Sequence, residues 1–342
     1  FARLLPSWIH KPSSWLVTGL VFLVLFGLLA WGSLALYWSN LPRFELRLLV
    51  ALAFALFGIW AMWFSRKSRM FFVFAGLFLL VLAYWWVIPA LQQRQWQTDV
   101  AVLPWAEIDG DRILLRNVRN FDYRSREDFT VRYEDREVFL SHLTGVDFFI
   151  SYWAKGPVGH TFVSFIFDNA PPVSISIETR PESHEGFAPI ASMFKQFELI
   201  YVIGDEKDIV GVRTNHRKED VFLYPVRISP EGARRLFLIY LERVNELAAR
   251  PEWYNLLSNN CTLNIVRYAN RAGRKDEFNI RHLLNGWFDA YLFKAGFLDT
   301  DLSFDELRRR SHINAAAQAA EGKPDFSERI RASLPEAPGR SN

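Results

Sequence analysis

Cysteine is almost absent from this chain, whose 342 residues include only Cys261. A single thiol cannot close a disulfide within the chain, and it cannot supply the cysteine pairs of a structural zinc site. The sequence also lacks a His-Glu-x-x-His metal motif, a glycine-rich dinucleotide or nucleotide-phosphate loop, and an internal repeat. We therefore expect no metal and no cofactor, and the chemistry has to come from the chain's own side chains.

Charge is missing from three long stretches near the N-terminus. Residues 15–38 and 70–91 contain no charged residue, and residues 46–64 contain only Arg47. Each stretch is about as long as the ~20 helical residues that cross a bilayer, and none has the polar stripe of a soluble amphipathic helix. The sequence thus predicts a transmembrane region at 1–91 with three helices, at about 15–38, 46–64 and 70–91.

Basic residues predict the orientation of these helices. Arg66, Lys67 and Arg69 lie between the second and third stretches, and the positive-inside rule makes that loop cytoplasmic. The N-terminus is then also cytoplasmic, and everything after the third helix lies outside. We expect a multi-pass membrane protein whose domain after the third helix faces away from the cytoplasm. The formal net charge of +3 is mild, and aromatic residues do not alternate with basic ones, so we expect no nucleic-acid partner.

The remainder of the chain predicts one α+β domain at 92–322 and a flexible tail at 323–342, which is rich in Pro, Glu, Arg and Ser. Runs of β-branched and aromatic residues predict short strands. The Asp-Asn-Ala-Pro-Pro turn at 168–172 predicts a hairpin between 161–167 and 173–178. Helices are predicted at 230–249, 261–272, 282–294 and 304–318.

Cys261 is the first residue of one predicted helix, which Asn259 or Asn260 can cap. A helix N-terminus favours a thiolate, because its free N–H groups and its dipole stabilise negative charge. His160 precedes a predicted strand and would act as the general base. In an oxidising compartment an unpaired cysteine is either buried and inert or retained for its reactivity. Both alternatives stay open here, as does a histidine with only a structural hydrogen bond.

A third member of the site is less well defined. The predicted hairpin places Glu178 near Phe162, close to His160, where a carboxylate would fix the imidazole ring. An ion pair between Glu178 and Arg180 is the alternative. Weaker candidates for this role are Ser174, Ser176 and Asn264. Four basic residues could form a phosphate-facing patch, but solvated surface charges are the favoured interpretation: Arg180, Arg213, Arg217 and Lys218.

Five segments together resemble one known family, the periplasmic domain of the Lnb-type bacterial lipoprotein N-acyltransferases. The most specific are Gly-His-Thr-Phe-Val-Ser-Phe at 159–165 and Asn-Asn-Cys-Thr at 259–262; the others lie at 173–180, 201–205 and 254–258. The resemblance covers about residues 115–290. It implies a papain-like thiol fold of permuted order, in which the histidine precedes the cysteine.

The resemblance also implies a reaction. A thiolate takes an acyl chain from a phospholipid as a thioester, and an amine then accepts it; for the Lnb type the acceptor is the N-terminus of a diacylated lipoprotein. Cys261 would be the nucleophile and His160 the base. Glu178 and Arg180 match a Ser-x-Glu-x-Arg stretch of the family without an assigned role. On this basis we expect catalytic residues Cys261, His160 and Glu178, and a substrate-binding group made by Asn260, Thr262, Arg180 and Tyr254.

Two other functions are compatible with the same residues. One is a papain-like peptidase or amidase of the cell wall, because a thiol and an imidazole also cleave amides. The other is an envelope scaffold or sensor that keeps the fold without catalysis. Three membrane spans precede the domain, and this layout leaves the acyl acceptor open between a lipoprotein and another amine.

Overall fold

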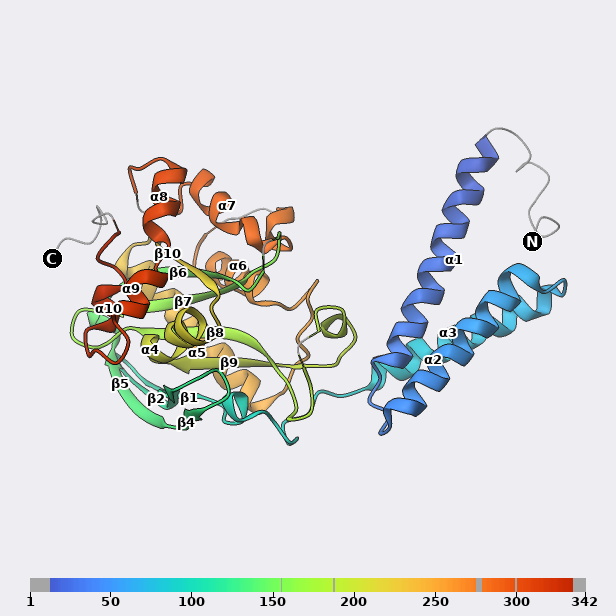
Figure 1. Cartoon of the computed structure of the whole chain (residues 1–342), viewed down its shortest axis with the longest axis horizontal. Coiled ribbons are helices and arrows are strands. Elements are labelled where there is room, and N and C mark those ends of the chain that lie inside the picture. The colour runs from blue at the N-terminus through green and yellow to red at the C-terminus, as the bar shows by residue number, and fades with distance from the viewer. Residues whose placement is uncertain (1–12, 155, 187, 275–278, 299, 335–342) are drawn as a thin grey trace. The chain divides into compact units, whose positions relative to one another are not determined.

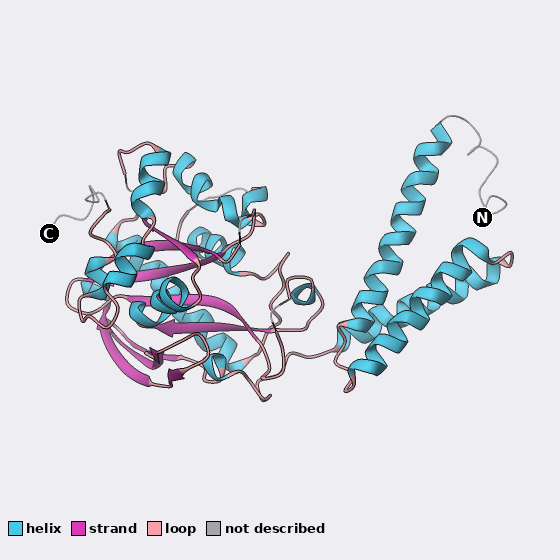
Figure 2. Cartoon of the chain, viewed as in Figure 1, coloured by secondary structure: helices cyan, strands magenta, loops and turns pink. Residues whose placement is uncertain are grey.

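The computed structural model describes residues 13–154, 156–186, 188–274, 279–298 and 300–334. These residues fold as two units (Figure 1): a helical unit made by 13–90 together with 188–196, and a domain made by 91–186 and 197–334. Helices and strands are mixed in the domain (Figure 2), and three apolar helices precede it. The predicted α+β class with an N-terminal region able to span a membrane is confirmed.

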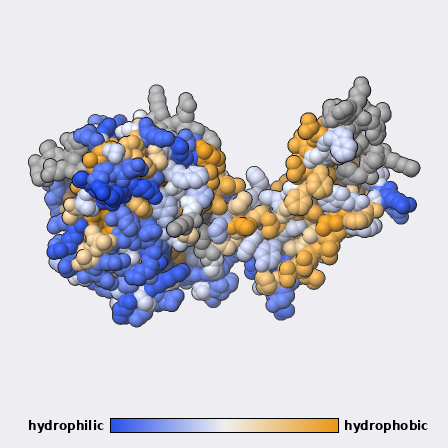
Figure 3. All heavy atoms as spheres, turned by 45° about the horizontal axis from the view of Figure 1, so that its top comes forward, coloured by the Kyte–Doolittle hydropathy of each residue, from blue (hydrophilic) through white to orange (hydrophobic). Residues whose placement is uncertain are grey.

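The helical unit contains three segments long and apolar enough to cross a bilayer, of 23, 21 and 20 residues. Apolar side chains cover much of their visible surface (Figure 3). The third helix ends at Val87 rather than at the predicted residue 91, because Pro89 cannot continue a helix. The elements are α1 (Ser13–Tyr37), α2 (Phe44–Ile59), a π-helical turn η2 (Trp60–Phe64) and α3 (Ser68–Val87).

The loop at 188–196 packs with these helices although it connects two strands of the domain. Phe194 is 3% exposed and lies against Trp31, with ring centroids 6.2 Å apart. Lys195 Nζ donates to the carbonyls of Trp85, Trp86 and Ile88, at 2.9, 3.1 and 3.1 Å. These carbonyls lie at the end of α3, where no intrahelical partner is left for them. The ammonium group therefore caps the third helix.

The domain is built on a sheet in the order β1-β2-β9-β8-β7-β6-β10, with β5 pairing the other edge of β2. All its pairings are antiparallel except that of β2 with β9. A separate small sheet joins β3 and β4. The strands are β1 (Trp105–Asp109), β2 (Arg112–Arg119), β3 (Asp122–Tyr123), β4 (Phe129–Thr130), β5 (Tyr133–Phe139), β6 (Leu143–Tyr152), β7 (His160–Phe167), β8 (Val173–Arg180), β9 (Glu198–Gly204) and β10 (Asp220–Pro225).

The predicted hairpin is present as β7 and β8, but its register differs by two residues. Phe165 pairs with Val173, and Phe162 therefore faces Ser176 rather than Glu178. The ladder starts only after Pro172, because a proline has no N–H to donate to it. Ser176 thus takes the position opposite Phe162 that the sequence had predicted for Glu178.

Helices cover both faces of the sheet. Side chains alternate along β7, so that Val163 and Phe165 pack in one apolar core and Phe162 packs in the other. The first core lies under α5 (Pro230–Ala249), α6 (Cys261–Arg271) and α7 (Phe288–Lys294). The second lies under α4 (Glu206–Gly211), a π-helical turn η6 (Val212–His216), α9 (Asn314–Ala319) and α10 (Phe326–Arg329).

Two helices predicted as continuous are interrupted. The first, expected at 282–294, consists of two 3-10 turns, η7 (Ile280–His282) and η8 (Asn285–Trp287), followed by α7. The second, expected at 304–318, is divided into α8 (Phe304–Ser311) and α9. It breaks because Ile313 donates its backbone N–H to Val221 of β10 at 3.0 Å, and His312 forms a β-bridge with Phe222. At the second break, contacts to a distant strand override the local helical pattern.

Part of the segment predicted as a flexible tail packs into the domain. Phe326 and Ile330 are buried in the second core. Arg331 binds two buried carboxylates, Asp147 at 2.9 Å and Glu206 at 2.6 Å. The basic and acidic composition that suggested disorder therefore reflects ion pairs. Residues 335–342 of the predicted tail lie outside the described residues.

Replacing Arg331 by alanine is expected to lower the free energy of unfolding by about 3–5 kcal/mol, because it leaves two buried carboxylates without a partner. Denaturant unfolding of the full chain in detergent, followed by tryptophan fluorescence, measures the loss. Arg329→Ala is the matched control, since Arg329 pairs with Asp325 at the exposed surface and should change little. Equal effects of the two substitutions would contradict a structural role for the Arg331 ion pairs.

Candidate active site

The nucleophile candidate Cys261 opens α6, as predicted. Asn260 is the N-cap: its Oδ1 accepts from the backbone N–H of Leu263 at 2.8 Å, and its Nδ2 donates to the carbonyl of Leu256 at 2.6 Å. The Asn-Cys-Thr sequence begins a helix here because the asparagine satisfies a donor of the first turn. Cys261 is therefore held where the remaining N–H groups and the dipole stabilise a negative sulfur.

The base candidate His160 begins β7 and lies beside the thiol. Its imidazole lowers the pKa of the Cys261 thiol through hydrogen bonding and charge. The Nε2 atom of the ring is 2.7 Å from Ser176 Oγ, across the hairpin. Because Nε2 is occupied by this hydroxyl, Nδ1 is the ring atom left for the sulfur. The structure thus brings together the two residues on which the sequence interpretation depended.

The thiol pKa is strongly perturbed. Burial of Cys261 opposes its ionisation, but the hydrogen bond and charge of His160 and two hydrogen bonds from Thr161 outweigh it and lower the pKa to about 6. The ordinary value is 9.0. At neutral pH the sulfur is accordingly a thiolate, the form that reacts with acyl carbonyls. The surroundings therefore differ from those of an inert apolar cysteine.

The sulfur is enclosed as well as activated, since Cys261 is 2% exposed. The buried Tyr254 hydroxyl interacts with both the backbone and the side chain of Cys261. Burial, with the nearby sulfur of Cys261 and the Glu178 carboxylate, raises the pKa of Tyr254, so the phenol stays protonated and can donate. A substrate carbonyl reaches the sulfur only by displacing this hydroxyl or another neighbour.

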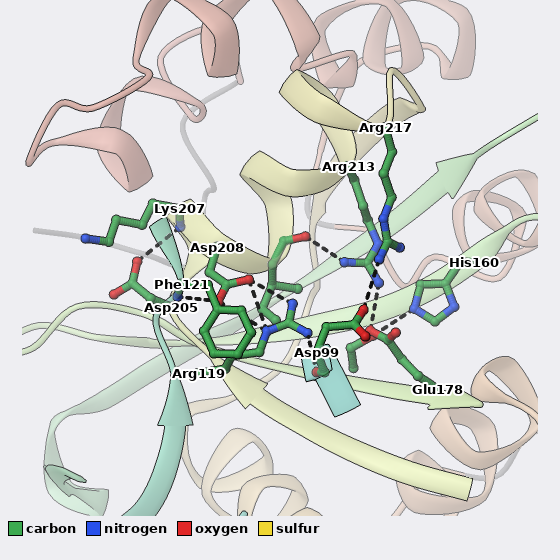
Figure 4. Close-up of polar contacts among 12 residues, drawn as sticks. Asp99, Arg119, Phe121, His160, Glu178, Asp205, Lys207, Asp208, Arg213 and Arg217 are labelled. Atoms are coloured by element: carbon green, nitrogen blue, oxygen red, sulfur yellow. Dashed lines mark hydrogen bonds and ion pairs between the residues drawn. The ribbon is translucent and has the colours of Figure 1, made fainter. Parts of the chain in front are cut away.

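Glu178, the predicted third catalytic residue, does not bond to the imidazole in this structure. Its carboxylate accepts from Arg213 Nη2 at 2.8 Å rather than pairing with Arg180 (Figure 4). Burial opposes its ionisation, but Arg213, then His160 and further arginines, outweigh that and hold the pKa of Glu178 far below its usual range. The carboxylate therefore supplies negative charge near the ring, while Ser176 makes the direct contact.

Arg213 was not expected in the site, since its sequence neighbourhood suggested a solvated charge. It is 2% exposed and lies over the Phe162 ring, 4.9 Å from its centroid. A second buried pair, Arg119 with Asp208 at 2.8 Å, lies in the same region of the domain (Figure 4). Nothing local in the sequence marks Arg213 as buried, because the burial comes from the fold around η6.

The four predicted substrate-binding residues have different surroundings. Asn260 and Tyr254 flank Cys261 as described above. Thr262 is fully buried, and its Oγ1 lies 2.9 Å from Thr161 Oγ1. Arg180 donates to the carbonyls of Val100 and Ala101, at 2.9 and 2.7 Å. This geometry makes Arg180 a support for the segment that enters the domain, and the assignment of these residues to substrate stays a prediction.

Asn285 is a site residue that the sequence reasoning missed. Its Nδ2 lies 3.8 Å from Cys261 Sγ and 3.0 Å from Thr262 Oγ1. It falls in the segment predicted as a continuous helix, so no local pattern set it apart.

As for metals, the described ranges contain no group of three or more His, Cys, Asp or Glu side chains placed to hold an ion.

Comparison with known protein families finds one match within the domain. Residues 129–286 match the model of the Lnb N-terminal periplasmic domain family, and this range includes both members of the thiol–imidazole pair. The resemblance predicted from the sequence is confirmed. Neither the curated proteins nor the solved structures yield a match to this chain. The family and the three apolar helices indicate a membrane protein with a periplasmic domain.

Proposed function

We propose that this chain, with its domain of the Lnb N-terminal periplasmic family, is a membrane-anchored cysteine acyltransferase. It moves an acyl chain from a phospholipid to an amine, and the N-terminus of a lipoprotein is the acceptor. The observation that carries the proposal is the buried thiol of Cys261, paired with His160 and lowered in pKa to about 6, in a chain that also contains three membrane-length helices.

The chemistry proceeds in two balanced steps. The Cys261 thiolate attacks an ester carbonyl of the phospholipid, so that a C–S bond forms and the ester C–O bond breaks. His160, which holds the thiol proton, passes it to the departing lysophospholipid oxygen. A neutral amine then attacks the thioester, His160 accepts the amine proton, and the C–S bond breaks to leave an amide and the regenerated thiolate.

The first turn of α6 and Tyr254 supply the oxyanion site. The backbone N–H of Cys261 meets the Tyr254 hydroxyl in the free protein. When a substrate carbonyl takes the hydroxyl's place, the N–H and the phenolic O–H can both donate to its oxygen. Preorganised donors of this kind typically contribute ~10²–10³-fold in kcat each.

Membrane anchorage suits such a substrate. Arg66 and Lys67 lie in the loop before α3, and Arg69 lies in the first turn of α3. The positive-inside rule assigns this end to the cytoplasm, so the N-terminus is cytoplasmic, the chain spans the inner membrane three times, and the thiol domain is periplasmic. Tethering keeps the reactive thiol near its lipid donor and raises the effective concentration of that donor.

The test uses the full chain in vesicles made of a phospholipid with an alkyne-tagged acyl chain. We expect a hydroxylamine-sensitive tag on the protein and its transfer to a diacylated lipopeptide with a free N-terminal amine. A lipopeptide with an acetylated N-terminus is the matched control. Absence of tagged protein and of tagged lipopeptide would refute the proposal.

Two alternative functions predict other outcomes. Release of cleaved stem peptides from purified peptidoglycan fragments, without acyl transfer, would identify a cell-wall peptidase or amidase. A Cys261 thiol that stays unreactive toward a thiolate-selective probe at neutral pH would identify a non-catalytic scaffold.

A further inference from the structure

Asn285 and Gly286 lie across the loop that leads into His160. Gly286 donates its backbone N–H to the carbonyl of Pro157 at 2.8 Å. The contact is so close that a Cβ on Gly286 would come within 2.6 Å of the Pro157 carbonyl carbon. Tyr152 Oη donates to the carbonyl of Gly286 at 2.7 Å. The two residues are thus fixed on the segment just before the base.

The Asn285 side-chain amide also binds this loop, at Gly159, and its contacts allow only one orientation of the amide. Its Oδ1 accepts from the backbone N–H of Gly159 at 2.8 Å, and its Nδ2 donates to the carbonyl of the same residue at 2.7 Å. A flipped amide would place N–H against N–H and oxygen against oxygen. The second N–H of Nδ2 is therefore directed away from Gly159.

That second N–H faces the start of α6. Thr262 Oγ1 lies 3.0 Å from Nδ2, and Cys261 Sγ lies 3.8 Å from it. Asn285 is 6% exposed, so water does not compete for the amide. One side chain thus joins the residue before the base to the first turn of the nucleophile's helix, and it presents a donor to the sulfur.

From these contacts we infer that Asn285 is a positioning residue for the thiol–imidazole pair: it holds the Gly159–His160 strand start against α6 and stabilises the thiolate through its N–H. A hydrogen-bond donor near a thiolate favours the ionised form, whereas a negative group at the same place opposes it. The inference rests on the thiol chemistry of the proposed function but not on the identity of the acyl acceptor.

The test is a titration of the thiol in Asn285→Asp. Aspartate has nearly the same shape and can still accept from Gly159, but it lacks the N–H and adds negative charge beside the sulfur. We expect the thiol pKa to rise by at least about one unit, a tenfold lower ratio of thiolate to thiol below the pKa. Because Cys261 is the only cysteine, the ultraviolet absorbance of the thiolate, with Cys261→Ser as the blank, reports this one site.

A matched control is available in α5. Asn245 makes the same paired bonds to a backbone residue, Ala106 of β1: its Oδ1 accepts at 2.9 Å and its Nδ2 donates at 2.8 Å. β1 lies at the edge of the sheet order, four strands away from β7. Asn245→Asp should disturb folding similarly and leave the thiol titration unchanged. An equal shift in both variants, or no shift in Asn285→Asp, would overturn the inference.

Asn285→Ala keeps the test decisive if the aspartate variant does not fold. It removes the N–H without adding charge, and we expect a smaller rise of the thiol pKa in the same direction; an unchanged titration would again overturn the inference. The outcome is separable from the proposed function. A shifted titration in a protein that transfers no acyl chain would refute the acyltransferase assignment and leave the role of Asn285 intact.

Discussion

Replacing Cys261 by serine is expected to reduce acyl transfer by about 10⁴-fold or more. A serine hydroxyl fits the same space, but its proton is far more tightly held than that of a thiol. The hydrogen bonds that lower the pKa of Cys261 to about 6 are too weak to ionise a serine hydroxyl at the same position. The initial rate of amide formation on the lipopeptide measures the effect, and no hydroxylamine-sensitive tag should remain on the protein.

Because the chain has no second cysteine, no other thiol can replace the lost one. Ser192→Ala serves as a control for the manipulation of a buried small side chain, since Ser192 belongs to the 188–196 loop of the helical unit. It should transfer the acyl chain at the wild-type rate. Transfer by the Cys261→Ser protein within tenfold of wild type would exclude Cys261 as the nucleophile.

Replacing His160 by alanine is expected to raise the pKa of the Cys261 thiol from about 6 toward or beyond its ordinary 9.0. Burial, which opposes ionisation, then acts without the hydrogen bond and charge of the imidazole. At pH 7 the thiolate fraction falls by up to about 100-fold for a shift of three units. Titration of the thiolate absorbance measures the shift, and loss of the base itself reduces transfer further.

His142→Ala is the matched histidine control. His142 lies at the other end of β6, where its Nδ1 is 2.6 Å from Asp168 at the surface. It should leave the thiol titration unchanged. In the wild-type protein, acyl transfer should decline as the pH falls through about 6, because the thiolate is protonated there. A thiol pKa that stays near 6 in His160→Ala would show that the imidazole does not activate the sulfur.

Much of the local structure could be predicted because it depends on neighbours in the sequence. Three apolar stretches of membrane length form helices, a double proline precedes the start of β8, and Asn260 caps the helix that begins at Cys261. Each is a short-range effect. The length of an apolar stretch matches the hydrocarbon thickness, a proline lacks the N–H that a strand ladder needs, and the Asn260 side-chain oxygen accepts from a free N–H of the first helical turn. The pairing of the thiol with the imidazole followed from the family resemblance rather than from spacing.

The features that sequence reasoning missed are set by distant contacts. The helix predicted at 282–294 is interrupted where Gly286 donates its N–H to the carbonyl of Pro157. The helix predicted at 304–318 is interrupted where Ile313 donates its N–H to the carbonyl of Val221. Arg213 appeared to be a surface charge until the fold placed it against Glu178. A two-residue difference in the hairpin register placed Ser176, and not Glu178, opposite Phe162. None of these partners can be read from residues nearby in the chain.

The loop at 188–196 has a practical consequence for anyone who separates the thiol domain from its helices. A fragment that starts at residue 92 would still carry Phe194, which the intact chain keeps 3% exposed, and Lys195, whose ammonium group would lose the three carbonyls that accept its bonds. In such a fragment the apolar 188–196 loop would be exposed to water and to other copies of the fragment. Work on the isolated domain will therefore require detergent or a shortened loop.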